Sequence, residues 1–446
     1  MSRPTRVDPA RMVAFEVLKA VRVEDAYTNL VLPALLRQHG LSGRDAGFAT
    51  ELASGTIRWQ GTYDAILTAC IDRPLRKVES KVLDALRLGC HQLLAMRVPT
   101  HAAISTTVEL VRFRVSAGAA GFANAVLRKV AQQDLAAWVA QVGTDPATAY
   151  SHPVWIVDEL RAALNHDSGG DAELDALLAA DNEPPKVTLV ARPGRSTRDE
   201  LPGEPTVFSP YGAVLAGGDP GQARAVAQGR AGVQDEGSQL VAIAAAAAPV
   251  EGPDVRWLDL CAGPGGKAAL LAAMAAGRGA GLVGSERQPH RAQLVRRALA
   301  GADGVLGVVA ADGTAAPYRP GTFDRVLVDA PCTGLGALRR RPEARWRRRP
   351  ADLVELTALQ RRLVDAALDL TRPGGIVLYA TCSPVLAETS GVVTAVLEGR
   401  TDAVLEDVGS LLPHVPDAVG PLPGTVQLWP HRHGTDAMFL ALLRRR

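Results

Sequence analysis

Five short apolar runs in the second half of the chain alternate with stretches of helical periodicity. The runs lie at 256–260, 281–285, 305–309, 325–329 and 375–380. Between them, apolar residues recur at three- and four-residue spacing, for example over 267–276, 289–299 and 353–370. Parallel strands joined by helices form a sheet with helices on both faces. We therefore predict a doubly wound α/β domain over residues 231–446, with a C-terminal hairpin (426–429 and 437–443) at the sheet edge.

The rest of the chain differs in pattern. Residues 1–140 show helical periodicity throughout, which predicts a compact all-α bundle. Residues 141–230 begin with an irregular connector and then mix short helices and strands with many glycines and prolines, which predicts a small α/β module. Three domains suit a chain of 446 residues.

Composition narrows the class of protein. The chain is 47% hydrophobic and 22% charged, as in ordinary globular proteins. Its longest nearly unbroken apolar stretch, 240–250, is far shorter than the ~20 residues that a membrane helix needs. Its five cysteines show no Cys-x-x-Cys spacing, which disfavours zinc and fits a reducing compartment. His431 and His433 flank an arginine, but we interpret them as loop histidines. We expect a cytoplasmic protein without a metal site.

Two cysteines directly follow predicted strands. Cys332 ends the segment Phe323–Cys332, and Cys382 ends the segment Gly375–Cys382. Parallel strands present their carboxyl ends at the edge of the sheet where α/β folds bind ligands. If the two strands are neighbours, both thiols face one pocket, which indicates covalent catalysis with one thiol attacking and the other assisting release. For either cysteine alone, a buried structural role would be the usual explanation.

The first predicted strand runs into a glycine-rich turn, Leu258–Lys267, and then a helix. Glycines let a ligand approach the backbone, and the helix N-terminus offers unpaired N–H groups. Glu286 ends the second strand, where a carboxylate can accept both hydroxyls of a ribose. Asp312 follows the third strand and could meet an adenine amino group. This arrangement predicts a cofactor that carries a nucleoside.

Two cofactors are compatible with the turn. Gly263, Gly265 and Ala268 fit a loose dinucleotide pattern, but that pattern has many chance matches. Asp259 inside the strand and Pro264 inside the turn disfavour a pyrophosphate. A sulfonium cofactor has a cationic centre and an amino acid tail, so neighbouring carboxylates suit it. We therefore favour S-adenosylmethionine over NAD.

A basic cluster follows Cys332. Residues 339–349 contain seven arginines, one glutamate and one tryptophan. Such a cluster can bind a nucleic-acid backbone with one stacking ring, and the predicted RNA-binding residues are Arg339, Arg340, Arg341, Arg345 and Trp346. The alternative is a solvated helix face in an arginine-rich chain. Lys267, the only lysine after Lys186, either has a specific task near a target base or is a surface residue of the first helical turn.

Several segments together resemble a known family. Asp259–Lys267, Asp329–Cys332 and Ala380–Ser383 are similar to the RNA cytosine-5 methyltransferases, as are Val233–Gln239 and Gly434–Phe439. Within the bundle, Asp45–Thr50, Leu86–Gly89 and Gly121–Arg128 resemble the NusB-type RNA-binding fold. The combination resembles the bacterial 16S rRNA cytosine-5 methyltransferases of the RsmB/Sun (Fmu) type. It implies a NusB-like bundle, an RRM-like middle module that binds RNA and a Rossmann-like S-adenosylmethionine methyltransferase domain.

The resemblance also implies partners and residue roles. The substrate would be a cytosine of small-subunit rRNA, free or partly assembled, and the protein a monomer away from membranes. Asp329 and Lys267 would act beside the target base. Cofactor contacts would come from Cys261, Ala262, Gly263, Pro264, Gly265, Gly266, Lys267, Glu286, Arg291, Asp312 and Asp329. Where the family commonly has a Glu-Glu-Asn-type run, this chain has Leu386–Ser390, a departure that affects the support of the Cys382 loop.

The chemistry at cytosine C5 needs an activated thiol. A thiolate that adds to C6 makes C5 nucleophilic, and a thiol with a pKa near ~8.5 needs nearby positive charge to ionise. On physical grounds either cysteine could attack. The RNA family uses the Thr-Cys position, which implies Cys382 as nucleophile, Cys332 as the group that assists release and Asp329 as a partner for N3. Two other functions compete: a non-catalytic RNA-binding assembly factor and an NAD-linked oxidoreductase.

Overall fold

The computed structural model describes residues 7–166 and 170–446, which form two compact units. The helical unit comprises the chain up to Asp158 together with Leu178–Pro184 and Leu338–Arg347. The sheet unit comprises Glu159–Leu177, Pro185–Ala337 and Arg348–Arg446. Residues 141–230, which we predicted to form a separate module, are thus shared between the two units.

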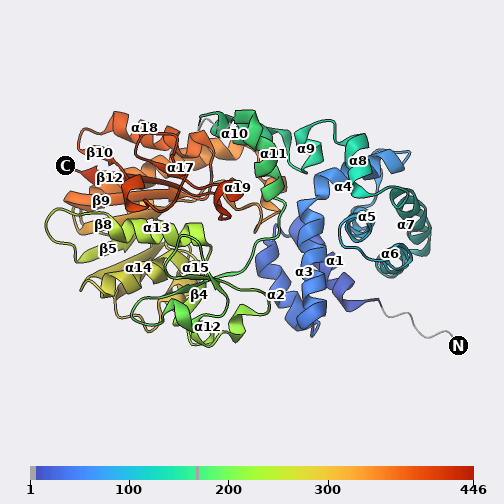
Figure 1. Cartoon of the computed structure of the whole chain (residues 1–446), viewed down its shortest axis with the longest axis horizontal. Coiled ribbons are helices and arrows are strands. Elements are labelled where there is room, and N and C mark those ends of the chain that lie inside the picture. The colour runs from blue at the N-terminus through green and yellow to red at the C-terminus, as the bar shows by residue number, and fades with distance from the viewer. Residues whose placement is uncertain (1–6, 167–169) are drawn as a thin grey trace. The chain divides into compact units, whose positions relative to one another are not determined.

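The helical unit is the predicted all-α bundle (Figure 1). Its core is formed by apolar side chains such as Phe15, Leu52, Ile57, Leu67 and Leu86, each at most 2% exposed. These residues recur at helical spacing, so each helix buries one face. The helices are α1 (Pro9–Val23), α2 (Thr28–Gln38), α3 (Gly43–Arg58), α4 (Gln60–Cys70), α5 (Ser80–Leu94), α6 (Thr100–Arg114), α7 (Ala117–Val130) and α8 (Leu135–Val142).

The sheet unit contains a mixed sheet in the order β10-β12-β9-β8-β5-β6-β7. The strands β9, β8, β5, β6 and β7 are parallel, which confirms the predicted doubly wound α/β fold. The strands are β5 (Arg256–Asp259), β6 (Gly281–Glu286), β7 (Val305–Ala310), β8 (Phe323–Asp329), β9 (Thr371–Thr381), β10 (Ala403–Glu406) and β12 (Phe439–Arg445).

The predicted C-terminal hairpin is present, but its second strand does not lie at the sheet edge. β11 (Val426–Gln427) does pair with β12, but β12 lies inside the sheet, antiparallel to both β9 and β10. The edge strand is β10, which the sequence did not indicate because it is only four residues long and three of them are half-exposed. The continuous burial of Phe439–Leu443 is what a strand with neighbours on both sides requires.

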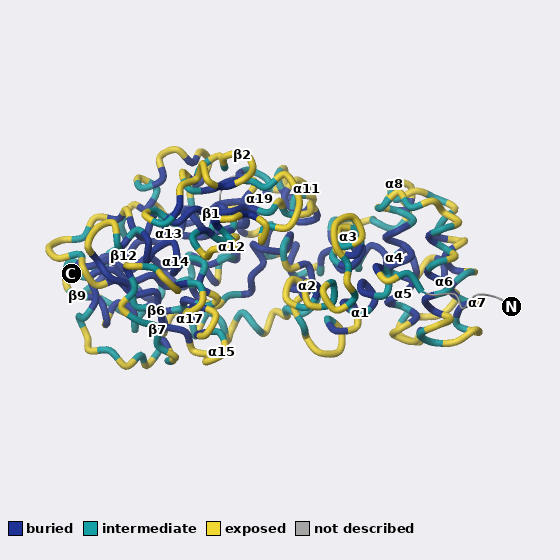
Figure 2. The backbone as a smooth tube through the Cα atoms, turned by 90° about the horizontal axis from the view of Figure 1, so that it is seen from below, coloured by how far each residue is buried: buried dark blue, intermediate teal, exposed yellow. Residues whose placement is uncertain are grey.

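Successive residues of the central strands contribute to opposite faces of this sheet. Leu327, Leu378 and Leu440 pack with helices α13 (Glu236–Ala247) and α14 (Gly266–Ala276). Val326, Val377 and Ala441 pack on the other face with α17 (Pro350–Leu370) and α18 (Ser390–Gly399). Helix α15 (Pro289–Leu299) follows β6. Because both faces are covered, the strands are buried along their length, as the dark blue of the sheet in Figure 2 shows.

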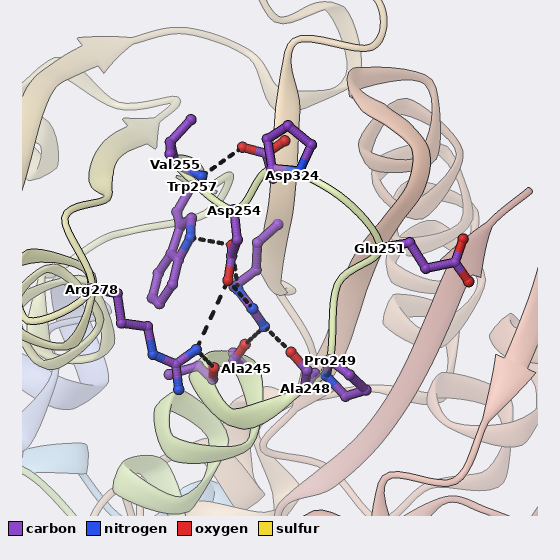
Figure 3. A network of polar contacts seen from close by, with 12 residues as sticks. Ala245, Ala248, Pro249, Glu251, Asp254, Val255, Trp257, Arg278 and Asp324 are labelled. Carbon is purple, nitrogen blue, oxygen red and sulfur yellow. Dashed lines mark hydrogen bonds and ion pairs between the residues drawn. The ribbon is translucent and has the colours of Figure 1, made fainter.

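Polar contacts tie the amino-terminal ends of the central strands to α13 (Figure 3). Arg325, 1% exposed, donates to the carbonyls of Ala245 and Ala248 at the C-terminal end of the helix, where a cation is favoured. Asp254 accepts from Arg325 Nη2 at 2.6 Å and from Trp257 Nε1 at 2.6 Å. These contacts fix where β5 and β8 begin, and therefore where their carboxyl ends emerge.

A second, antiparallel sheet lies within the sheet unit in the order β2-β3-β1-β4. Its strands are β1 (Thr188–Ala191), β2 (Glu204–Pro205), β3 (Gly212–Val214) and β4 (Ala231–Val233). This confirms a small sheet in the middle of the chain, with its own core around Leu189 and Ala213. Across the two described ranges, no helix has the length and apolar character needed to cross a bilayer.

Candidate active site

The two thiols predicted to face one pocket are in contact. Cys332 and Cys382 follow the neighbouring parallel strands β8 and β9, in which Asp329 pairs with Ala380. The Sγ atoms are 3.4 Å apart, within hydrogen-bond distance for sulfur. Both residues are half-buried, so the pair borders solvent at the carboxyl edge of the sheet.

Lys267 and Asp329 form an ion pair beside the thiols. Lys267 lies in the first turn of α14, and its Nζ is 2.9 Å from Asp329 Oδ2 at the end of β8. The Lys267 side chain is only 12% exposed, so it is not a surface lysine. Burial alone would lower the pKa of Lys267, but the charge and hydrogen bond of Asp329 and the charge of Cys382 raise it. Lys267 is therefore a persistent cation near the Cys382 sulfur.

Cys332 lies in a different electrostatic environment. The hydrogen bond to Cys382 raises the pKa of the Cys332 thiol well above its usual range, and burial and the charges of Cys382 and Glu388 add to this effect. A thiol in this environment keeps its proton at neutral pH. The groups around the pair differ in sign, because the charge of Glu388 acts on Cys332 and the Lys267 ammonium interacts with Cys382.

Asp259, at the end of β5, is a buried carboxyl group next to the ion pair. It is 0% exposed, and burial together with the charge of Asp329 raises its pKa to about 8. Its Oδ1 accepts from the Cys261 amide at 3.3 Å, whereas Oδ2 has no hydrogen-bond partner among the described residues. Such a group is costly unless a donor or cation binds to it.

We expect Asp259→Asn to stabilise the ligand-free protein increasingly as pH rises. Between the unfolded pKa of Asp, about 3.9, and the folded value, the native protein holds a proton that the unfolded chain has lost, so wild-type stability falls as pH rises through this window. Asparagine does not titrate and can still accept from Cys261. The difference in free energy of unfolding should grow by about 1 kcal/mol per pH unit from pH 5 to 8 in urea titrations. A difference independent of pH would contradict the assignment, and Glu355→Gln on exposed α17 surface is the control.

The glycine turn between β5 and α14 lies too close to its neighbours to carry side chains at two positions. Gly265 is the N-cap of α14 with φ +116°, which favours glycine, and a Cβ there would lie 2.6 Å from Ala298 Cβ. A Cβ on Gly263 would collide with the Glu286 carboxylate. The turn is therefore packed closely against Glu286 and α15, and this packing requires glycine at both positions.

Two of the predicted cofactor residues organise this turn. Glu286 ends β6, is 5% exposed and accepts from the Gln288 amide at 2.9 Å. Arg291 donates from Nη2 to Gly263 O at 2.8 Å, and its Nε is 3.7 Å from Glu286 Oε2. Arg291 thus connects the turn to the end of β6.

Asp312 lies beyond β7 and is engaged with its own turn. Its Oδ1 accepts from Thr314 N at 2.9 Å and Thr314 Oγ1 at 2.8 Å, and these hydrogen bonds lower the pKa of the carboxyl group. The side chain is 45% exposed, so Oδ2 remains accessible beside Arg287.

The donor set fits a cofactor that carries positive charge. The buried Asp259 Oδ2 lacks a partner, and Asp329 and Glu286 lie within its electrostatic field. The acidic groups Asp259, Asp329 and Glu286 offset the cations Lys267 and Arg291, so the site has no excess positive charge for a pyrophosphate, whereas a sulfonium with an α-amino group would be attracted. The residues therefore fit S-adenosylmethionine better than NAD.

A hydrogen-bond network that the sequence did not reveal supports the two cysteine loops. Glu388, in the segment Leu386–Ser390, is 0% exposed and accepts from Thr333 N at 2.8 Å. Thr333 follows Cys332, and its hydroxyl is 3.1 Å from that of Ser383, which follows Cys382. Although the segment Leu386–Ser390 departs from the family's usual run, its Glu388 supports the Cys382 loop through Thr333. The only sequence signal was an acidic residue in an otherwise apolar and hydroxyl-bearing segment.

The segments Val233–Gln239 and Gly434–Phe439 are connected through Asp235. Its Oδ2 caps α13 by accepting from Gly237 N at 2.9 Å and also accepts from Asp436 N at 3.1 Å. Ala437 N then donates to Gly336 O at 2.8 Å, and Gly336 N donates to Cys382 O at 2.9 Å. These two segments therefore brace the loops behind the thiols from the backbone side.

The residues of the predicted RNA-binding cluster differ in burial, and only some of them are accessible to a ligand. Arg345 is 0% exposed within the helical unit, where its guanidinium donates to the carbonyls of Arg58, Ser151 and Asp181 and to Asn182 Oδ1. Trp346 donates from Nε1 to Ile57 O at 2.7 Å. Arg345 is thus not accessible to a phosphate, which corrects its expected role. Arg339 is 8% exposed, Arg340 is half-exposed and Arg341 is exposed.

We expect Arg345→Met to destabilise the protein by about 3 kcal/mol, because it leaves several buried carbonyls without donors. Burial lowers the pKa of Arg345 to about 9, which is still high enough for the guanidinium to remain charged at neutral pH. Denaturant unfolding measures the effect, and Arg341→Met on the same segment is the exposed control, with a change below about 0.5 kcal/mol. Equal effects of the two variants would contradict a structural role specific to Arg345.

His431 and His433 are explained by protein contacts. His431 Nε2 is 2.7 Å from Glu173 Oε2, and His433 Nε2 is 2.8 Å from Pro416 O. Among the residues that the structure describes, no cluster of three or more His, Cys, Asp or Glu side chains could hold a metal ion.

Comparison with known proteins matches both parts of the chain. A family model described as 16S rRNA methyltransferase RsmB/F matches residues 245–444, and the NusB family model matches residues 8–132. A putative methyltransferase of Mycobacterium tuberculosis is 51% identical over 98% of this chain and 97% of its own length. A probable ribosomal RNA small subunit methyltransferase B of Bacillus subtilis is 30% identical over 98% of both chains.

Solved structures share the fold. The crystal structure of PH0851 superposes with a TM-score of 0.77 at 20% identity and covers 99% of this chain and 100% of its own. NSun6 from Pyrococcus horikoshii superposes with a TM-score of 0.53 at 17% identity and covers 66% of this chain and 98% of its own. At these identities the likeness shows the fold alone, including the Rossmann-like arrangement of the sheet unit.

Proposed function

This chain belongs to the RsmB/F family of 16S rRNA methyltransferases, and on that premise we propose that it methylates C5 of a cytosine in small-subunit rRNA through a covalent cysteine–C6 adduct. Its methyl donor is S-adenosylmethionine. The observation that carries the proposal is the 3.4 Å separation of the Cys332 and Cys382 sulfurs. A single pyrimidine ring can reach both.

The proposed nucleophile is Cys382. Lys267, held as a cation by Asp329, interacts with the Cys382 sulfur and favours its thiolate. As the Sγ–C6 bond forms, the C5–C6 π electrons become a C4–C5 double bond and the N3–C4 π electrons move onto N3, which takes up a proton. We assign delivery of that proton to Asp329, whose Oδ1 would bring it from solvent while Oδ2 stays on Lys267.

Cys332 is the proposed partner for release. Its raised pKa keeps it protonated while Cys382 attacks, so it does not compete as a nucleophile. Once the Cys382 sulfur is bonded to C6, its charge and its hydrogen bond no longer raise the pKa of Cys332, so Cys332 can release its proton to solvent. The resulting thiolate then accepts the proton from C5. The C5–H electrons then restore the C5–C6 double bond as the Cys382 Sγ–C6 bond breaks. A sulfur with a high pKa is the stronger base for this step.

The turn residues Cys261–Lys267, with Glu286 and Arg291, are the proposed cofactor contacts, and Asp312 would meet adenine through its exposed oxygen. When bound, S-adenosylmethionine supplies an electrophilic methyl group on a cationic sulfur. Asp259 and Asp329 would bind the cationic sulfonium more tightly than the neutral thioether that remains after methyl transfer. This difference would help S-adenosylmethionine to replace the used cofactor.

The remaining assignments concern partners. We propose that the target nucleotide is unstacked to enter the site, so single-stranded or loop RNA is preferred. The exposed Arg341, with Arg340 and the NusB-like bundle, would contact the phosphate backbone. We also propose a monomer that works in the cytoplasm on rRNA, free or partly assembled.

The decisive assay combines purified protein, methyl-labelled S-adenosylmethionine and unmodified small-subunit rRNA. We expect label in 5-methylcytosine at a single position, located by nuclease mapping. Calorimetry should detect S-adenosylmethionine but not NADH, which separates the proposal from an oxidoreductase. Absence of label from naked rRNA and from assembly intermediates alike would favour a non-catalytic assembly factor.

A further inference from the structure

The carboxylate of Glu388 connects the two cysteine loops through hydrogen bonds to residues next to the cysteines. Its Oε1 accepts from Thr333 N at 2.8 Å and from Gln360 Nε2 at 3.0 Å, and its Oε2 accepts from Thr333 Oγ1 at 2.5 Å. Thr333 Oγ1 lies 3.1 Å from Ser383 Oγ. One carboxylate thus contacts the Cys332 loop directly and reaches the Cys382 loop through one hydroxyl.

Two further hydrogen bonds fix the backbone and the neighbours of this carboxylate. Gln360 Nε2, on α17, also donates to Pro331 O at 2.8 Å, just before Cys332. Tyr379 on β9 donates from its hydroxyl to Glu388 O at 2.7 Å. Glu388 is the last residue of the helical turn Leu386–Glu388. Its position is therefore set by β9 and α17, and it transmits that position to both loops.

Burying the carboxylate of Glu388 costs free energy that a purely structural residue would not need to cost. It is 0% exposed, and no ion pair of Glu388 occurs within the described ranges. A buried carboxylate without a cation costs several kcal/mol unless hydrogen bonds satisfy it, and a neutral side chain would avoid that cost. A negative charge at this place therefore suggests a task in the reaction.

We propose that Glu388 is a positioning residue that holds the Cys332 and Cys382 loops at their working separation and supplies negative charge on the Cys332 side of the pair. This inference rests on the proposed function. Lys267 supplies the opposite charge on the Cys382 side. The two charges together polarise the thiol pair, so that the proton stays on Cys332 and the thiolate forms on Cys382.

The charges and titratable groups that face Glu388 are consistent with this role. Burial, Glu388 and Cys332 raise the pKa of Tyr379, which therefore remains a neutral donor. Arg348 donates to the carbonyls of Thr333 and Cys332 at 3.0 and 3.3 Å, on the backbone side of the loop. Neither group provides a counter-charge in contact with the Glu388 carboxylate.

Two substitutions separate the charge of Glu388 from its geometry. Glu388→Gln keeps the acceptor for Thr333 N and Gln360, and its amide can donate to Thr333 Oγ1 if that hydroxyl turns toward Ser383. Glu388→Ala removes both charge and contacts. Thr333→Val keeps the backbone contact to Glu388 and removes the hydroxyl, with its hydrogen bond to Glu388 Oε2 and its bridge to Ser383. Glu398→Gln, at an exposed position of α18, is the matched control.

The first readout uses the full-length protein without RNA or cofactor. Alkylation of each cysteine is followed against pH by peptide mass spectrometry. We expect the midpoint for Cys332 to fall by about one pH unit in Glu388→Gln and to stay unchanged in Glu398→Gln. An unchanged midpoint in Glu388→Gln would overturn the electrostatic part of the proposal, whether or not the protein methylates rRNA.

The second readout is single-turnover methyl transfer. Glu388→Ala should lower the rate by about 100-fold with unchanged affinity for S-adenosylmethionine, because misplaced reacting groups cost about that much. Glu388→Gln should restore most of the rate, and Thr333→Val should fall between them. Wild-type rates in Thr333→Val and Glu388→Ala would overturn the positioning role. If wild-type protein transfers no methyl group, the proposed function fails while the alkylation result still stands.

Discussion

Replacing Cys332 with alanine is expected to arrest the reaction at a covalent protein–RNA complex that survives denaturing electrophoresis. Cys382 can still attack C6 because Lys267 and Asp329 remain, but no base is left to take the C5 proton. The C6–Sγ bond therefore persists after methylation. Single-turnover methylation should remain detectable, whereas multiple turnover should fall by at least about 1,000-fold, as for other residues that act as a unit in covalent catalysis.

Cys382→Ala provides the opposite outcome. It removes the nucleophile, so neither methylation nor a trapped complex is expected. The double variant Cys332→Ala, Cys382→Ala should also give no complex, which excludes trapping through Cys261. If Cys382→Ala accumulates the complex and Cys332→Ala does not, the two roles are reversed, and the electrostatic distinction between the thiols has been misjudged.

The contact between the thiols was predictable because it depends on local patterns and one general rule. Each cysteine follows an apolar run, and neighbouring parallel strands present their carboxyl ends at one edge. The strand neighbours β8 and β9 are joined by α17, a single crossover, so adjacency was the simplest topology. The edge position expected for β12 is wrong because β10 pairs with it on the outer side, and β10 is too short and too exposed to be recognised from the sequence.

The role of Glu388 and the burial of Arg345 could not be predicted in the same way. Glu388 becomes a shared support only when α17 brings Gln360 beside Pro331, which is a tertiary event. Arg345 and Arg341 belong to one arginine-rich run, yet one is buried against backbone carbonyls and the other is exposed. A run of identical residues carries no signal for which of its members a neighbouring surface will cover.

Asp329→Asn is expected to lower the single-turnover rate by about 100- to 10,000-fold, the range for loss of a general acid or base. The substitution keeps the shape of the side chain but removes its charge and its capacity to carry a proton to N3. It also removes the charge that raises the pKa of Lys267 and leaves only a neutral acceptor for its ammonium, so the burial of Lys267 would then lower that pKa and weaken support for the Cys382 thiolate. Formation of the covalent complex should therefore slow together with methyl transfer.

A double-mutant cycle with Lys267→Met tests whether the ion pair acts as one unit. If Lys267 works mainly through Asp329, the double variant should be about as slow as the slower single variant, because the second substitution removes an interaction already lost. Independent roles would instead multiply the two rate losses. Affinity for S-adenosylmethionine, measured by calorimetry, distinguishes a loss of chemistry from a loss of cofactor. A rate for Asp329→Asn within about threefold of wild type would exclude Asp329 from the proton path, and N3 would then need another donor.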